Sequence, residues 1–166
     1  GDVYKRQVKG KTLKCKVIVT KKQAAKKNAK TAGKKNTTSD ISLQKKVISI
    51  VNKNRKKKGL EALTMDEKLM KAAQDRAKEL TKSFSHTRPN GTSCFTIFEK
   101  YKITPTASGE NIAAGQRSAA AVMDSWMNSP GHKENIMNNR FKKIGVGLVI
   151  VPNDMYSYYW VQMFTE

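Results

Sequence analysis

Residues 40–80 read DISLQKKVISIVNKNRKKKGLEALTMDEKLMKAAQDRAKEL, and they predict two consecutive amphipathic helices. In the first, Ser39 or Asp40 is placed to cap the N-terminus, and Gly59 follows a cationic run as terminator. Its apolar residues recur at helical spacing, at Leu43, Val47, Ile50 and Val51. The second helix opens at a capping box, Thr64–Glu67, and carries the apolar stripe Met65, Leu69, Ala72, Ala73, Ala77 and Leu80. The small alanines permit a close approach to a sheet or another helix.

The last quarter of the chain predicts a β-hairpin. Ile144, Val146, Leu148 and Ile150 alternate with other residues, a turn follows at 152–154, and alternation resumes from Tyr156 to Phe164. Between the helices and the hairpin, the pattern favours a short helix over 93–101, a loop over 104–115 and a helix from Ser118 to Asn128. Helices that precede a terminal hairpin indicate an α+β fold, and residues 40–166 are numerous enough for one hydrophobic core.

Positive charge is concentrated in the first third of the chain. Up to Lys58 there are 20 Lys or Arg against 2 Asp, whereas from Gly59 onward there are 13 against 11. Residues 21–39 are Lys, Ala, Asn, Thr and Gly with almost no large apolar side chain, which predicts a disordered, Lys-rich linker. A basic arm of this kind can attract nucleic acid, anionic lipid or an anionic cell wall. It can equally be a solvated linker that its own charge keeps extended.

The first twenty residues are set apart from the fold. Residues 1–7, GDVYKRQ, resemble the translation of a sequencing adapter, and we interpret them as an artefact that replaces the true N-terminus and any signal peptide. Residues 8–20, VKGKTLKCKVIVT, alternate as a half-buried strand does. They resemble the last strand of a bacterial immunoglobulin-like domain of group 2. We therefore expect the remnant of a truncated domain that lacks its β partners.

Three polar stretches hold the only two histidines: FSHTRPNG (84–91), GENIA (109–113) and WMNSPGHKENI (126–136). His86 and His132 each stand beside turn residues, a placement typical of residues that line a cleft. Two imidazoles and a carboxylate can bind a divalent metal such as Zn²⁺. The same side chains can instead form a hydrogen-bonded network that holds loops together. The two cysteines, Cys15 and Cys94, match neither a disulfide framework nor a zinc motif.

Taken in this order, the three stretches resemble the bacterial branch of the CAP superfamily (cysteine-rich secretory, antigen 5 and pathogenesis-related proteins, also called SCP-like). VNKNRKKKGLEALTMDEKLMKAAQDRAKEL (51–80), FKKIGVGL (141–148) and YWVQMF (159–164) extend the resemblance over nearly the whole of residues 40–166. It implies an α-β-α sandwich with a central antiparallel sheet. It also implies a cleft with a His-Glu-Glu-His tetrad that binds a divalent cation in some members.

The resemblance assigns cleft residues one by one. His86, Glu110 and His132 match three members of the tetrad and are the implied metal ligands, while Ser129 stands where the second Glu is usual. Asn111 is expected to orient the Glu110 loop. Glu134 is near in sequence and is a further cleft candidate. With one carboxylate missing, we expect only weak Zn²⁺ binding, completed by water or a ligand.

The function expected from these observations is a secreted or cell-surface CAP module without catalytic activity. The alternative is an extracellular metal-assisted hydrolase of peptidase type, in which Glu110 activates a metal-bound water. Neither a Ser-His-Asp order nor an HExxH motif is present, so catalytic residues stay unassigned. The basic arm lacks aromatic residues for base stacking, apart from Tyr4, which argues against nucleic acid. We expect a monomer with no membrane span, whose arm binds an anionic cell-wall polymer outside the cell.

Overall fold

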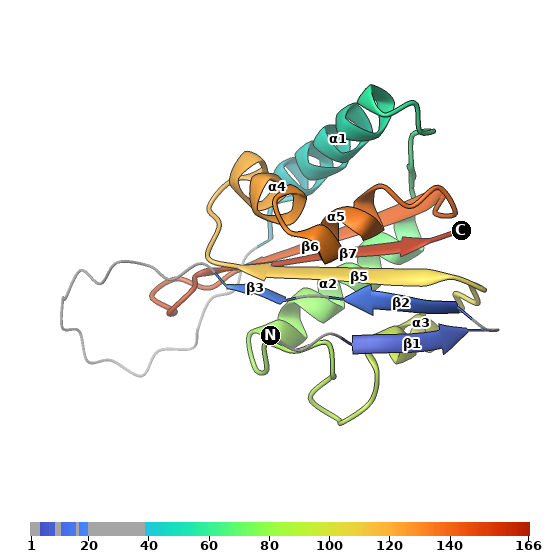
Figure 1. Ribbon diagram of the computed structural model, residues 1–166. Coiled ribbons are helices and arrows are strands. Elements are labelled where there is room, and N and C mark those ends of the chain that lie inside the picture. Colours follow the sequence, from blue (N-terminus) through green and yellow to red (C-terminus); the bar gives the residue numbers. More distant parts are fainter. Residues whose placement is uncertain (1–3, 9–10, 16, 20–38) are drawn as a thin grey trace.

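A computed structural model of the chain describes residues 4–8, 11–15, 17–19 and 39–166 (Figure 1). Its elements are β1 (Tyr4–Val8), β2 (Lys11–Cys15), β3 (Val17–Val19), α1 (Ile41–Lys57), β4 (Thr64–Met65), α2 (Glu67–Leu80), the 3-10 turn η1 (Cys94–Thr96), α3 (Ile97–Lys100), β5 (Ser108–Ala114), α4 (Ala119–Met127), α5 (Pro130–Ile136), β6 (Lys143–Ile150) and β7 (Tyr158–Thr165). The helices and the terminal hairpin predicted from periodicity are confirmed. Among the described residues, no helix combines the length and apolarity needed to cross a membrane.

The central sheet separates two layers of helices, as the sandwich prediction requires. Its strand order is β3-β5-β7-β6-β4. The three long strands β5, β7 and β6 pair antiparallel, while the short edge strands β3 and β4 pair parallel with their neighbours. Figure 1 shows α1, α4 and α5 over one face and α2 with α3 over the other. The expected antiparallel sheet is therefore confirmed for its centre and is mixed at its edges.

Each face of the sheet has its own apolar core. Ile144, Val146 and Trp160 pack against α1 and α4, whereas Val149 and Val161 pack against α2 and α3. Alternation along the hairpin thus divides its side chains between two cores rather than between a core and water. Because both faces are covered, every residue of β5 is buried.

The strand β5 corrects the sequence prediction of a loop over 104–115. Ser108–Ala114 pairs along its whole length with β7. Its sequence, SGENIAA, shows no alternation because both faces are buried, and its polar residues suggested a loop. The helix α5 was likewise not predicted, because its seven residues are short and include Pro130 and Gly131.

Helix ends follow the predicted chemistry, with one exception. The Asp40 carboxylate accepts from the backbone N–H groups of Ser42 and Leu43, and Gly59 has the left-handed φ of 69° that favours glycine. For α2, however, the cap is Asp66, which accepts from the N–H of Leu69. Thr64 was expected to cap but instead belongs to β4, because its backbone pairs with Lys143 of β6.

The predicted single strand over 8–20 is divided in the structure. β2 pairs antiparallel with β1, which includes most of the segment 1–7 that was interpreted as an artefact. β3 pairs parallel with Ile112–Ala114 of β5. The described strands thus have β partners, because the outer edge of β5 offers unpaired backbone groups to a neighbouring strand. The origin of the segment in an immunoglobulin-like domain stays a prediction, and the linker 21–39 lies outside the described residues except for Ser39.

Two glycines of β6 set the height of α2 above the sheet. A Cβ atom placed on Gly145 would lie 2.2 Å from the carbonyl carbon of Leu69, and one on Gly147 would lie 2.1 Å from the carbonyl oxygen of Ala73. These neighbours are helix backbone, which has no rotamer by which to move aside. The helix therefore rests directly on the strand, as the small residues Ala72, Ala73 and Ala77 of α2 suggested.

We predict that Gly147→Ala destabilises the protein by about 3 kcal/mol or more, the largest cost usual for overpacking a core. The reason is that the added methyl group would displace the whole of α2 from the sheet. Urea unfolding followed by circular dichroism measures the loss. The reference is Gly91→Ala, which has open space around its Cβ but a φ of 82°, so it should cost only the left-handed strain of about 1–2 kcal/mol. Equal losses for the two variants would contradict close packing as the cause.

Candidate functional site

The site is built around one buried carboxylate, Glu110 of β5. Arg76 of α2 donates from Nε to Oε2 at 2.9 Å and from Nη2 to Oε1 at 3.2 Å. His86 approaches Oε1 with its Nδ1 at 2.8 Å. The side chains of Arg76 and Glu110 are fully buried, and that of His86 is 5% exposed. Both carboxylate oxygens therefore have charged or polar partners away from water.

Burial alone would raise the pKa of Glu110. The positive charge of Arg76, together with hydrogen bonds from His86 and Arg76, outweighs burial and holds the pKa below its ordinary value. The same pairing raises the pKa of Arg76 although burial opposes this. The site therefore contains an ionised pair at neutral pH.

Arg76 also joins the strand to the loop that carries His86. Its Nη2 donates to the carbonyl oxygen of Ser85 at 2.9 Å, and its Nη1 donates to Glu79 at 2.7 Å. Glu79 in turn accepts from Arg88 at 2.7 Å. Because the guanidinium contacts α2, β5 and the 85–88 loop together, it fixes the position of His86. Sequence reasoning missed Arg76, although its i,i+3 spacing to Glu79 on a predicted helix was a visible signal.

The ring of His86 has one engaged and one unengaged nitrogen. With Nδ1–H donating to the Glu110 carboxylate, a neutral ring carries its lone pair on Nε2. That atom is buried and has no hydrogen-bond partner among the residues that the structure describes. A histidine held by a carboxylate on one nitrogen is the usual arrangement for a metal ligand, with the carboxylate orienting the ring. Glu110 here has the geometry of an orienting group more than that of a ligand.

Asn111, next to Glu110, holds α5 against the sheet. Its Nδ2 donates to the carbonyl oxygen of His132 at 3.1 Å and to Gln162 at 3.0 Å, and its Oδ1 accepts from Asn135 at 2.9 Å. These four side chains are almost completely buried. The predicted role of Asn111 was to orient the Glu110 loop, but its direct partners are α5 and β7.

The other predicted cleft residues divide into buried and exposed groups. His132 is buried, and its Nδ1 shares a hydrogen bond of 2.8 Å with the hydroxyl of Ser129, which lies directly before α5. Glu134 lies on the exposed side of α5. The structure therefore places Ser129 beside His132 and leaves Glu134 facing away from the site.

Within the described part of the chain, the side chains with metal-binding atoms all within 4.8 Å of one another are His86, Cys94 and Glu110. Cys94, which the sequence did not suggest as a ligand, belongs to this cluster. A β-bridge between Thr87 and Ser93 turns the loop back, so that the N–H of Cys94 donates to the carbonyl oxygen of His86 at 3.0 Å. Eight residues separate the two in sequence, and only this turn places them together. The expected trio of His86, Glu110 and His132 does not form this cluster.

Comparison with known proteins gives a consistent result. The family model of the CAP cysteine-rich secretory protein family matches residues 48–164. The chain is 37% identical over 153 residues to the uncharacterized protein YkwD of Bacillus subtilis, and the match covers 85% of this chain and 60% of that protein. It is 32% identical over 120 residues to an uncharacterized protein of Borreliella burgdorferi, covering 71% and 74%. The chain thus spans only part of these relatives.

Solved structures show the same similarity. An outer surface protein of Borrelia burgdorferi matches with a TM-score of 0.72 and 27% identity, over 80% of this chain and 98% of that one. An extracellular protein of Bacillus anthracis that contains an SCP domain matches with a TM-score of 0.68 and 26% identity, over 76% of this chain and 41% of that one.

The lowered pKa of Glu110 predicts a specific acid sensitivity. A carboxylate whose folded pKa lies below its unfolded value stabilises the fold above the ordinary value of 4.5, and this stabilisation is lost as pH falls through the folded pKa. We expect the free energy of unfolding to fall below pH 4.5 and the fall to be shallower in Glu110→Gln, whatever the variant's absolute stability. Urea titrations across this range measure it. Glu134→Gln, at an exposed carboxylate, is the control, and an acid slope unchanged in Glu110→Gln would contradict the assignment.

Proposed function

The chain belongs to the CAP cysteine-rich secretory protein family, and on this basis we propose that it is an extracellular or cell-surface binding module rather than an enzyme. The similar proteins named as an outer surface protein and an extracellular protein support the location. The main support for a binding role is the state of Glu110. Both its oxygens are engaged and its pKa lies below the ordinary value.

A general base works best when its pKa lies near the working pH. Glu110 is a weak base at neutral pH, because a proton on its carboxylate would weaken its pairing with Arg76. Among the described residues, no second carboxylate shares the cluster of His86, Cys94 and Glu110. The hydrolase alternative therefore needs Glu110 to leave Arg76 before it can activate a water.

We further propose that the site takes up Zn²⁺ weakly, with Nε2 of His86 as the principal ligand atom. Within the described part of the chain that buried nitrogen has no hydrogen-bond partner, which is the observation that favours a ligand there. Cys94 belongs to the same cluster and is the candidate second donor, whereas His132 was the donor expected from the sequence. His86 and Cys94 supply two protein donors, fewer than the three that hold zinc in catalytic sites, so binding at this site should be weak. Water or a small molecule would complete it.

Zinc calorimetry of single variants tests this ligand set. We expect His86→Ala to abolish Zn²⁺ uptake by the full chain. Glu110→Gln should weaken uptake by about 10- to 100-fold, as loss of an orienting partner does. Cys94→Ser and His132→Ala identify the second donor, and Ser129→Glu should tighten binding by adding a carboxylate beside His132. If the wild-type chain takes up no zinc and Ser129→Glu changes nothing, the site is a structural network.

The partner of the proposed surface module is an anionic cell-wall polymer, bound by the chain as a monomer through its basic arm. The support is the charge of the arm, since residues 1–39 contain many lysines and one acidic residue, Asp2. Polyanions attract such segments through counterion release, which salt suppresses. Binding should therefore be strong at low ionic strength and weak at high ionic strength.

Co-sedimentation with purified cell-wall fragments tests this partner. We expect the full chain to pellet with the walls in low salt and to stay in solution in high salt. Replacing the seven lysines of residues 21–35 with Gln should reduce the bound fraction severalfold, because each lost contact removes a released counterion. Pelleting that does not respond to salt or to these substitutions would contradict the arm as the attachment.

The alternative function, a metal-assisted hydrolase, is tested by a peptidase assay on the same preparation, with and without Zn²⁺.

A further inference from the structure

The folded domain has a second basic surface, which is separate from the arm. In α1, Lys45, Lys46, Lys53, Lys56 and Lys57 are all exposed, and the helix contains no acidic residue. None of the five forms an ion pair within the part of the chain that the structure describes. Lysines elsewhere differ, since Lys78 and Lys100 pair with Asp75 and Lys142 pairs with Glu61.

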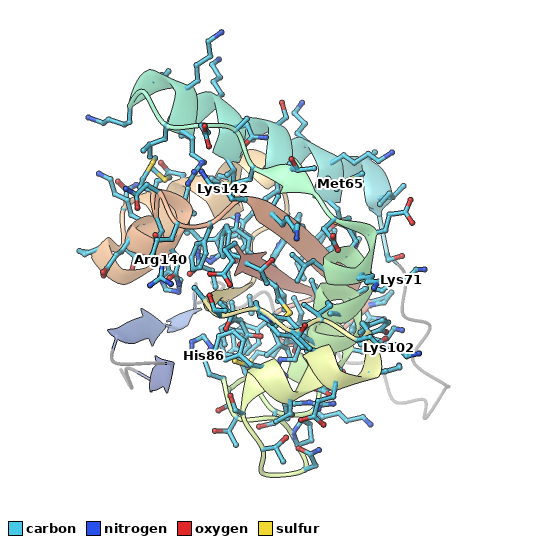
Figure 2. The ribbon with its side chains drawn as sticks, turned by 90° about the vertical axis from the view of Figure 1, so that its right-hand side faces the viewer. Met65, Lys71, His86, Lys102, Arg140 and Lys142 are labelled. Carbon is cyan, nitrogen blue, oxygen red and sulfur yellow. The ribbon has the colours of Figure 1, made fainter. Side chains whose placement is uncertain are left out.

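The five lysines share one side of the helix. At 3.6 residues per turn they fall within an arc of about 120°, and positions 45 to 57 span about 18 Å along the axis. The buried residues of α1 fall within an arc of about 100° on the opposite side: Gln44, Val47, Ile48, Val51 and Arg55. The lysine face is thus directed away from the domain by the packing of α1 against α4 and β6. Figure 2 shows α1 at the upper edge of the domain with side chains extending away from it.

Folding does not require this concentration of charge. Lys53 lies three and four residues before Lys56 and Lys57, and like charges at these spacings repel and destabilise a helix. The one arginine of the helix, Arg55, has a structural role, since it is buried and donates to the carbonyl oxygens of Glu61, Ile136 and Asn138. The five lysines form no such hydrogen bond with the residues that the structure describes.

We propose that this lysine face of α1 binds a linear polyanion of the cell envelope. The five lysines are spread along about three turns of the helix. Such an extended array matches a chain of regularly spaced anions better than a single compact anion. Within the arc of the lysines the other residues are Ser42 and Ser49, while the exposed Ile41 and the half-buried Ile50 lie outside it, so the face itself is polar. The inference rests on the proposed location at the cell surface for its biological partner, but polyanion binding itself is measurable on the purified chain.

The test uses the full chain and inorganic polyphosphate as the probe. The variant replaces Lys45, Lys46, Lys53, Lys56 and Lys57 with Gln, which keeps helix propensity. The matched control replaces five exposed lysines that lie away from this face: Lys68, Lys71, Lys82, Lys102 and Lys143. Lys71 and Lys102 are labelled in Figure 2. The two variants have the same net charge, so only the position of the lost charges differs.

We expect the Kd of the α1 variant to rise about tenfold or more at low salt, and the slope of log Kd against log salt to become shallower by several units. The control should stay within about twofold of the wild type, apart from the general effect of net charge. Circular dichroism should show an unchanged helix content in both, and the α1 variant should melt at the same or a higher temperature because repulsion is removed.

Three results would overturn the proposal. The first is equal weakening by the α1 variant and the control, which would reduce the effect to net charge. The second is loss of binding only when the lysines of residues 21–35 are replaced, which would assign the polyanion to the arm alone. The third is tighter binding to vesicles of anionic phospholipid than to polyphosphate with the same dependence on α1, which would make the partner a membrane. If the cell-wall assay fails while polyphosphate binding is intact, the cell-wall polymer is rejected as the partner, and the lysine face remains assigned as a polyanion-binding surface.

Discussion

The contact between α2 and the middle of β6 is the constraint on which the other features depend. Because Gly145 and Gly147 have no side chains, the backbone of α2 at Leu69 and Ala73 lies directly on the strand. At this height Arg76, one turn further along α2, reaches across the sheet to Glu110 of β5. A thicker contact would move the guanidinium away from the carboxylate. The apolar packing of one face thereby determines the geometry of the polar site.

The buried pair of Arg76 and Glu110 connects the site to the fold. Taking two charges out of water costs free energy, and only good geometry with further hydrogen bonds offsets that cost. Here the carboxylate accepts from Arg76 and His86, and the guanidinium also donates to Glu79 and Ser85. The same contacts that hold the loop in place keep Glu110 ionised and make it a poor base.

Charge is distributed by element rather than evenly over the molecule. From Gly59 onward, 13 basic residues stand against 11 acidic ones, and many of them pair across the surface. In α1, one face completes the core, while the opposite face carries lysines that form no ion pair with the other described residues, together with small polar residues. An amphipathic helix thus gives the domain both its packing and a cationic face.

The sequence by itself determined the elements whose pattern depends on one covered face or on a cap. These are α1 with Asp40 and Gly59, α2, α4 with Ser118, and the hairpin of β6 and β7. Motif resemblance also predicted His86, Glu110 and His132 as residues of the site, and the first two of these lie in one cluster. Only the tertiary structure decided that Ser108–Ala114 is a central strand, because a strand covered on both faces has no alternation to show. It also placed Cys94 rather than His132 beside His86 and Glu110, and left Glu134 exposed. Distances between side chains on different elements are set by how closely helix and sheet pack, and local sequence carries no measure of that separation.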